Sequence, residues 1–260
     1  FFISITFTSS FSFANDLCKN FYESLNLNEF PVSEIQDDTA FLDVNLFTYV
    51  FNLSNLNIKD GTYNFNIRSV FFFEDKRLQD YIISNQISNQ FSCDFNFNQI
   101  EDRYLFPDIY FNTIEDVKKN RDKIIFEFDG EDFYVRRIVD NLSIYTSEYI
   151  FDFKKFPFDK QYLSFDIVTD ERNIVIDNEV FNYIVNFIPD EDDEYFINKS
   201  DIDFLNDSVF GWQFIDIFNN YDENSGMFEI VFEIERDYFY FLFKVAFPIL
   251  LIVTICWSVF

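Results

Sequence analysis

Histidine is absent from this chain of 260 residues, and cysteine occurs only three times, at Cys18, Cys93 and Cys256. Without histidine, a catalytic triad of the Ser-His-Asp type has no general base. Scattered cysteines and no imidazole also leave a zinc site of the Cys/His type without its ligands. Turn signals are few as well, with four glycines and five prolines. These absences exclude most hydrolases and zinc-binding proteins, and we do not expect an enzyme.

Positive charge is also scarce. The chain has 19 lysines and arginines against 46 aspartates and glutamates, which gives a formal net charge of −27 at pH 7. A nucleic-acid-binding protein needs clustered positive charge to neutralise phosphates, so nucleic acid is excluded as a partner. Apolar residues, in contrast, make up 48% of the chain and aromatic residues 22%. This composition is typical of a folded protein with a large core.

The first 14 residues are apolar and rich in serine and threonine, and they are followed by the polar pair Asn15-Asp16. Ser12 and Ala14 stand where a small-residue cleavage site requires them, so we interpret residues 1–14 as the remnant of a secretory signal peptide. A first apolar strand is the alternative. Export would bring Cys18 and Cys93 into an oxidising compartment, where they could form a disulfide, but the sequence leaves this pairing open.

At the other end, Phe239 to Phe260 is a run of 22 residues with one charge, Lys244, and one proline, Pro248. As a helix rising about 1.5 Å per residue it would extend about 33 Å, enough to cross a hydrocarbon core of about 30 Å. Lys244 lies near one end, where its charge can reach the membrane interface. We expect a membrane helix over residues 237–260, after a domain over residues 15–236; a buried core helix is the alternative.

Between Phe41 and Arg236, short runs alternate apolar with polar residues. A period of two is typical of strands with one buried face. Because no helical period competes with it, the pattern predicts a mainly β domain, an immunoglobulin-like antiparallel sandwich. Asp129-Gly130 predicts a hairpin turn, and Asn20 to Glu29 could form a short helix. The runs expected to form strands are 41–53, 62–73, 123–130, 132–139, 142–153, 161–168, 209–218 and 227–236.

Carboxylates are densest in Asp190 to Glu194, and Asp201, Asp203 and Asp207 follow. Their mutual repulsion predicts an extended and exposed loop. Hard divalent cations prefer converging carboxylate oxygens, so Glu191, Asp192 and Asp193 are candidate ligands of a modulating Ca²⁺. A solvated loop without metal is the alternative, and no other cofactor is expected.

The sequence Phe156-Pro157-Phe158-Asp159 is a candidate turn. Proline fixes its own φ at about −65°, which favours a turn that directs Phe156 and Phe158 outward. Asp159 and Arg236 are then suited to form a charge pair where the β domain meets the membrane helix. Asp60 is a second candidate acid for this pair. Alternatively, Arg236 only flanks the span, as basic residues often do.

The run from Lys154 to Val168 resembles the Phe-Pro-Phe-Asp signature of pentameric ligand-gated ion channels, the superfamily of the nicotinic and GABA receptors. Three further similarities follow the order of that family. Phe73 to Leu78 resembles the end of its second strand, and Leu105 to Ile109 resembles its loop A. Arg236 to Phe239, with Pro248 after it, resembles the start of its first membrane helix. The similarity extends from Phe41 to Phe260.

Some positions depart from the family pattern. Leu163 stands where the eukaryotic Cys-loop has its second cysteine, so the chain is more similar to the prokaryotic branch, which lacks that disulfide. Residues 170–175 are similar to those of bacterial proton-gated members. Phe73 and Leu105 replace the two signature tryptophans, and Asp170 replaces the cation-binding tryptophan of acetylcholine receptors, which argues against an acetylcholine-like aromatic box.

The resemblance implies a homopentameric channel subunit in the cell membrane, multi-pass in the full-length protein, with its sandwich extracellular or periplasmic. A small-molecule agonist or protons would bind between subunits and open a pore through the lipid bilayer, and the acidic charge favours cation selectivity. By position, the ligand-binding residues would be Arg68, Asp170, Glu171, Arg172 and Tyr221. The residues coupling binding to gating would be Asp60, Phe156, Pro157, Phe158, Asp159 and Arg236.

Two other functions stay open on the sequence. One is a pentameric ligand-binding protein with the same sandwich and no pore. The other is a secreted carbohydrate-active sandwich, because abundant Asp and Glu could supply an acid-base pair for glycoside hydrolysis.

Overall fold

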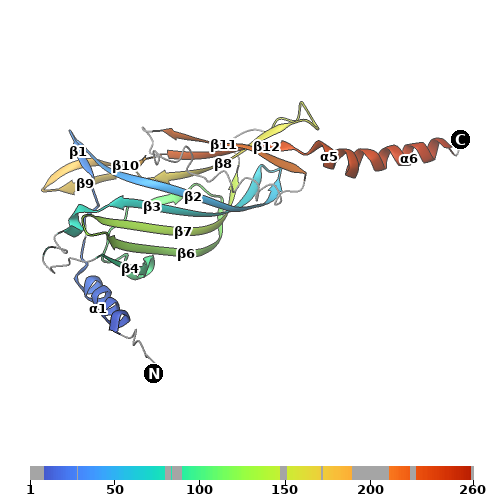
Figure 1. The fold of residues 1–260 in the computed structure, drawn as a ribbon. Coiled ribbons are helices and arrows are strands. Elements are labelled where there is room, and N and C mark those ends of the chain that lie inside the picture. The colour runs from blue at the N-terminus through green and yellow to red at the C-terminus, as the bar shows by residue number, and fades with distance from the viewer. Residues whose placement is uncertain are drawn as a thin grey trace, which may run out of the picture.

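The computed structural model describes residues 9–27, 29–79, 83, 90–146, 151–170, 172–188, 211–222 and 227–258. Strands account for 58% of the described residues and helices for 20%. The prediction of a mainly β chain is therefore confirmed, and the strands are arranged in two sheets that Figure 1 shows as layers, with the C-terminal helix extending beyond one end of them.

Within the described ranges, the larger sheet has eight strands and the smaller sheet has four. The larger sheet has the order β4 (Phe91–Asn96), β6 (Glu115–Phe128), β7 (Phe133–Thr146), β3 (Thr62–Glu74), β2 (Thr39–Asn57), β10 (Glu179–Ile188) and β9 (Arg172–Ile176), and β1 (Glu34–Gln36) pairs with β2. The smaller sheet has the order β11 (Trp212–Asp222), β12 (Met227–Arg236), β8 (Lys160–Thr169) and β5 (Ile109–Phe111).

One strand pair corrects the prediction of an antiparallel fold. β2 and β10 run parallel, with Thr39 opposite Asn182, whereas the other strand pairs described are antiparallel. The larger sheet is therefore mixed. The alternation of apolar and polar residues reports which face of a strand is buried but not which strand lies beside it. The sequence pattern therefore could not predict that β2 and β10 run parallel.

The core lies between the two sheets. Along β3 and β7, buried residues alternate with half-buried ones, as a period of two requires. Phe65 of β3 contacts Phe165 of β8 and Phe232 of β12, with ring centroids 5.5 and 4.9 Å apart. Tyr63 donates from its hydroxyl to the Ser164 carbonyl and accepts from the Ser164 amide at 2.9 Å. Each such buried ring contributes about 1.5–3 kcal/mol of hydrophobic stabilisation.

Most of the expected strands are present, but their division differs. The runs 132–139 and 142–153 do not form two strands: β7 continues from Phe133 to Thr146. The short strands β1, β4, β5 and β9, and the ten-residue strand β10, were not expected from the sequence. The hairpin at Asp129-Gly130 is confirmed: it joins β6 to β7, Gly130 has a φ of 114°, and Asp129 accepts from the amides of Glu131 and Asp132 at 2.9 and 3.0 Å.

The N-terminal helix α1 (Ser9–Ser24) begins and ends earlier than the helix expected over Asn20 to Glu29. It stops because the next residues pair elsewhere: Leu27 donates its amide to the Arg103 carbonyl at 2.8 Å and accepts from the Leu105 amide at 3.1 Å. Since residues 9–14 are helical, the alternative of a first apolar strand is wrong for them. The signal peptide stays a prediction.

A disulfide joins Cys18 of α1 to Cys93 of β4, which decides the pairing that the sequence left open. Beside it, the fully buried Phe21 packs on Phe126 and Phe133, with ring centroids 5.0 and 5.9 Å apart. One covalent bond and one aromatic anchor therefore fix α1 to the edge of the larger sheet.

The C-terminal helix is continuous from Tyr238 to Ser258, and its 21 residues are long and apolar enough to cross a membrane. It comprises α5 (Tyr238–Phe241), a π-helical turn (Leu242–Ala246) and α6 (Phe247–Ser258). Its apolar surface is exposed, with none of the tested window buried, so the alternative of a buried core helix is wrong. The π turn precedes Pro248, whose ring in a regular α-helix would meet the carbonyl four residues earlier.

Candidate functional site

The best-defined polar cluster lies where the smaller sheet meets the C-terminal helix. Asp159 directly precedes β8 and Arg236 ends β12, and these neighbouring strands bring the two residues together. Arg236 donates from Nε to Asp159 Oδ1 at 2.8 Å and from Nη2 to Asp159 Oδ2 at 3.1 Å. The Asp159 side chain is fully buried and that of Arg236 is 16% exposed. The charge pair expected from the sequence is therefore present, in two-point geometry.

Gln161 completes the polar contacts of this pair. It donates from Nε2 to Asp159 Oδ2 at 2.8 Å, and it is itself held by the backbone amide and carbonyl of Asp152, both at 3.0 Å. Burial of Asp159 favours its neutral form, but the hydrogen bonds from Arg236 and Gln161 outweigh burial and lower its pKa below the ordinary value. Asp159 is therefore a stably ionised group inside the protein.

Aromatic rings surround the guanidinium of Arg236. Its central carbon lies 4.3 Å from the ring centroid of Trp212 and 4.8 Å from that of Phe156. Phe156 in turn contacts Phe241 of the C-terminal helix edge to face, with centroids 4.9 Å apart. We call Phe156, Asp159, Gln161, Trp212 and Arg236 the junction cluster. Through it, the turn before β8 touches the first turns of the apolar helix.

The turn itself is exposed beside this contact. The residues Phe156 and Phe158 are 49% and 64% exposed, as expected for side chains that point outward, and the Phe156-Pro157 peptide bond is cis. The Phe158 ring lies 6.1 Å from that of Tyr238, the first residue of α5. Both phenylalanines of the turn therefore face the root of the helix.

Backbone contacts also define the junction. Asp237 donates its amide to the Gly211 carbonyl at 2.9 Å, and its side chain accepts from the amides of Phe239 and Tyr240 at 3.0 and 3.2 Å. Gly211 has a φ of 84°, and a Cβ there would lie 3.0 Å from the Tyr240 ring. A side chain at position 211 would thus press against the Tyr240 ring.

Asp60, the second candidate acid, does not join the junction cluster. Its carboxylate accepts from the Asn57 side chain at 2.7 Å in the exposed turn between β2 and β3. No ion pair links Asp60 with Arg236, both of which the structure describes. Figure 1 places this turn (cyan) at the same end of the sheets as the C-terminal helix.

A second polar group lies at the other end of the smaller sheet, where β8 ends and β5 begins. Arg172 forms an ion pair with Asp108, and its Nη2 is 3.9 Å from an Asp170 carboxylate oxygen. Tyr110 donates its hydroxyl to Asp170 at 3.1 Å, and Arg172 lies 4.9 Å from the Phe30 ring centroid. Asp170 and Arg172, both expected in a ligand site, are therefore brought together. Asp108 and Tyr110 join them, although the sequence did not mark them as ligand residues. We call Asp108, Tyr110, Asp170 and Arg172 the Asp170 group.

The remaining expected ligand residues are placed differently. Tyr221 lies on β11 opposite Phe228 of β12, which is opposite Ile167 of β8, so its backbone is near the same end of the smaller sheet as Asp170. Glu171 lies outside the described residues. The topology thus brings the ends of three strands toward the Asp170 group.

Arg68 lies on the larger sheet and already has a partner. Its Nε and Nη2 donate to the two carboxylate oxygens of Asp140 on β7 at 2.6 and 2.8 Å, and its guanidinium lies 5.2 Å from the Phe51 ring centroid. No ion pair joins Arg68 to Asp170 in the part of the chain that is described. A cross-strand ion pair accounts for Arg68, and its role in ligand binding stays a prediction.

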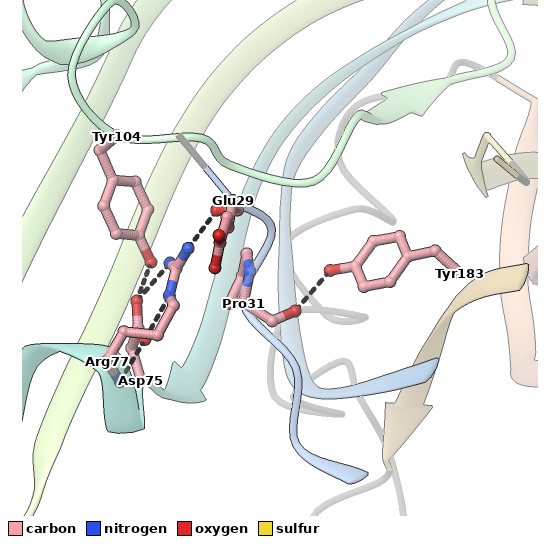
Figure 2. A network of polar contacts seen from close by, with 6 residues as sticks. All are labelled: Glu29, Pro31, Asp75, Arg77, Tyr104 and Tyr183. Atoms are coloured by element: carbon pink, nitrogen blue, oxygen red, sulfur yellow. Dashed lines mark hydrogen bonds and ion pairs between the residues drawn. The ribbon is translucent and has the colours of Figure 1, made fainter. Parts of the chain in front are cut away.

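A buried polar network that the sequence did not indicate lies at the end of β3 (Figure 2). Arg77 donates to both carboxylate oxygens of Asp75, at 2.8 and 2.6 Å, and Tyr104 donates its hydroxyl to Asp75 at 2.6 Å. Burial, and then the charge of Asp75, raise the pKa of Tyr104 well above its ordinary value. The Asp75-x-Arg77 spacing was the only sequence signal, because Tyr104 comes from a distant segment.

The same network fixes the segment that follows α1. Arg77 donates to the Glu29 carbonyl, and Tyr183 of β10 donates to the Pro31 carbonyl at 2.9 Å (Figure 2). Asp75, Tyr104 and Tyr183 are buried although Glu29 is exposed, and both hydrogen bonds hold the chain between α1 and β1 in place.

The carboxylates proposed for calcium, Glu191, Asp192 and Asp193, lie outside the described residues. Among the residues that are described, no group of three or more acidic or cysteine side chains is arranged to hold a metal ion.

No protein-family model and no curated protein matches this chain. The case for a function therefore depends on the residues and contacts described above.

Proposed function

We propose that this chain is the outer domain and first membrane helix of a subunit of a prokaryotic-type pentameric ligand-gated ion channel, with the two sheets forming an immunoglobulin-like sandwich outside the membrane. The observation that supports it most is the junction cluster, in which Asp159 and Phe156 hold Arg236 directly before an apolar helix of 21 residues. The four family-like motifs in family order support it further.

Two strands connect the proposed ligand site with the junction. β8 runs from Lys160, next to Asp159, to Thr169, next to Asp170. β12 is paired with it along its length and ends at Arg236. A ligand or a proton bound at the Asp170 group would shift β8 and β12 together, and the junction cluster would transmit the shift to the helix. This is coupling through a continuous hydrogen-bonded element.

Charge and compartment agree with this function. Five copies with a formal charge of −27 each would raise the local concentration of cations at a pore mouth, which favours cation conduction. Proton gating would have to use carboxylates, because the chain has no histidine. The Cys18–Cys93 disulfide is typical of an extracellular or periplasmic domain.

The test is electrical recording from the protein expressed from its complete coding sequence, with native mass spectrometry of the purified material. We expect a homopentamer and a cation current opened by a small-molecule agonist or by acid. Arg236→Gln should abolish the current while agonist binding persists, whereas Lys160→Gln, which alters an exposed ion pair with Glu233 on the same strands, should leave the current intact.

A protein that is not pentameric, or a current insensitive to Arg236→Gln, would contradict the proposal. A pentamer that binds the agonist without carrying current would identify the pore-less binding protein instead.

A further inference from the structure

A pocket of about 560 Å³ opens on the larger sheet, and its lining shares no residue with the junction cluster or the Asp170 group. Its lining residues Tyr134 and Arg136 alternate along β7 with the buried Phe133, Val135 and Arg137, so they lie on the face that points away from the core. The pocket extends over four strands and the β6–β7 hairpin. Its lining includes Phe72, Gln90, Glu127, Asp129, Tyr134 and Arg136.

Two aromatic rings form one wall of this pocket. Phe72 of β3 and Tyr134 of β7 are stacked, with ring centroids 4.9 Å apart and planes inclined by 20°. The guanidinium of Arg136 lies 5.5 Å from the Phe72 ring centroid. The Arg136 side chain thus already lies near part of this aromatic surface. Aromatic faces attract organic cations in the same way.

The charge around these rings is negative. Arg136 is neutralised by Glu127, with 3.0 Å between Nη2 and Oε2. Asp129 adds a further carboxylate to the lining, and its pKa is lowered by the amides of Asp132 and Glu131, so it stays ionised. The pKa of Tyr134 is raised by its burial and then by the charges of Asp132, Asp129 and Glu74. The surroundings of Tyr134 therefore contain one positive group, the Arg136 guanidinium, and four carboxylates.

We propose that this pocket binds a small organic cation of the ammonium class, with its charged group against the rings of Phe72 and Tyr134 and near the carboxylates of Glu127 and Asp129. A weakly hydrated ammonium loses little on leaving water and gains contact with the aromatic surface that the stacked rings leave uncovered. The volume is within the range of small-molecule sites. This proposal is independent of the channel function, since it uses none of the residues of the junction cluster or of the Asp170 group.

The experiment is a ligand-observed NMR titration of the full chain in detergent with choline, compared with its uncharged analogue 3,3-dimethyl-1-butanol. We expect choline to bind and the uncharged analogue to bind at least about tenfold more weakly. Phe72→Leu and Glu127→Gln should each weaken choline binding by about tenfold, because the first removes a ring and the second leaves Arg136 uncompensated in the pocket.

Two variants serve as controls. Tyr49→Leu removes another half-exposed ring from the same sheet, and Tyr110→Phe alters the Asp170 group; neither should change choline binding. Circular dichroism establishes that each variant is folded. Equal binding of the uncharged analogue would overturn the proposal, and so would a loss of choline binding in Tyr110→Phe with no loss in Phe72→Leu.

Discussion

Arg236 and Asp159 are 77 residues apart in the chain, yet their side chains form a two-point ion pair at the place where β12 becomes the apolar helix. The side chain of the acid is fully buried, and the guanidinium of the base lies 4.8 and 4.3 Å from two aromatic ring centroids. This pair joins the turn before β8 to the strand that leads into the apolar helix.

Removing the base of this pair should destabilise the β domain. Arg236→Gln leaves the Asp159 carboxylate buried without its cation, and we expect a loss of about 3 kcal/mol in the free energy of unfolding. The measurement is urea unfolding followed by circular dichroism. In Lys160→Gln, which breaks the exposed pair with Glu233, the loss should stay below about 1 kcal/mol. Equal losses in the two variants would contradict the special role of burial.

The same pair predicts a dependence on pH. The folded-state pKa of Asp159 lies below its ordinary value of about 3.9, so its stabilising effect is complete above that value and is lost as pH falls through the lower folded-state pKa. Urea midpoints at pH 6, 4 and 3 should therefore fall more steeply below pH 4 in the parent protein than in Asp159→Asn. If the urea midpoints of the two proteins fall equally with pH, Asp159 contributes no such effect.

Gly211 should be intolerant of any side chain. Alanine there would have a positive φ and would also meet the Tyr240 ring at 3.0 Å. Gly61, with a φ of 67° and open space around it, is the matched control for backbone strain alone. We expect Gly61→Ala to cost about 1–2 kcal/mol in unfolding free energy and Gly211→Ala to cost more. Fluorescence of Trp212 should shift only in Gly211→Ala. A larger loss of unfolding free energy in Gly61→Ala than in Gly211→Ala would argue against the close contact with the Tyr240 ring.

Reduction should loosen the N-terminal helix. The Cys18–Cys93 bond closes a loop of 75 residues, for which chain entropy predicts about 4 kcal/mol of stabilisation. Melting followed by circular dichroism should show a lower transition temperature for Cys93→Ser or in dithiothreitol. Cys256→Ser, which alters the exposed cysteine of the C-terminal helix, should melt like the parent. Mass spectrometry should find one free thiol in the oxidised protein; three free thiols would contradict the disulfide.

Features that depend on neighbouring residues could be predicted from the sequence. The apolar helix follows from 22 residues with one charge, and the hairpin at Asp129-Gly130 follows from its turn residues. The Asp159–Arg236 pair required more: the two side chains have complementary charges, but the resemblance to a known family was needed to place these distant residues at one junction.

Features that depend on tertiary partners could not be predicted. In the sequence, Arg68 is typical of a ligand-binding residue on a strand. The structure pairs it with Asp140, which lies 72 residues later in the chain. The α1 helix ends at Ser24 because Leu27 pairs with a segment near Tyr104, a contact that has no local signal. Alternation likewise could not indicate that β2 and β10 run parallel, since both directions bury the same face.

The parallel pairing of β2 with β10 affects the order of events during biosynthesis. Asp43 on β2 accepts a hydrogen bond from Asn186 on β10, 143 residues later in the chain. Closing so long a loop carries an entropic cost before any contact compensates for it, and topologies with such contacts fold slowly. β2 therefore has one unpaired edge until the ribosome has delivered β10. If the chain is exported during translation, the final closure of the larger sheet happens on the far side of the membrane.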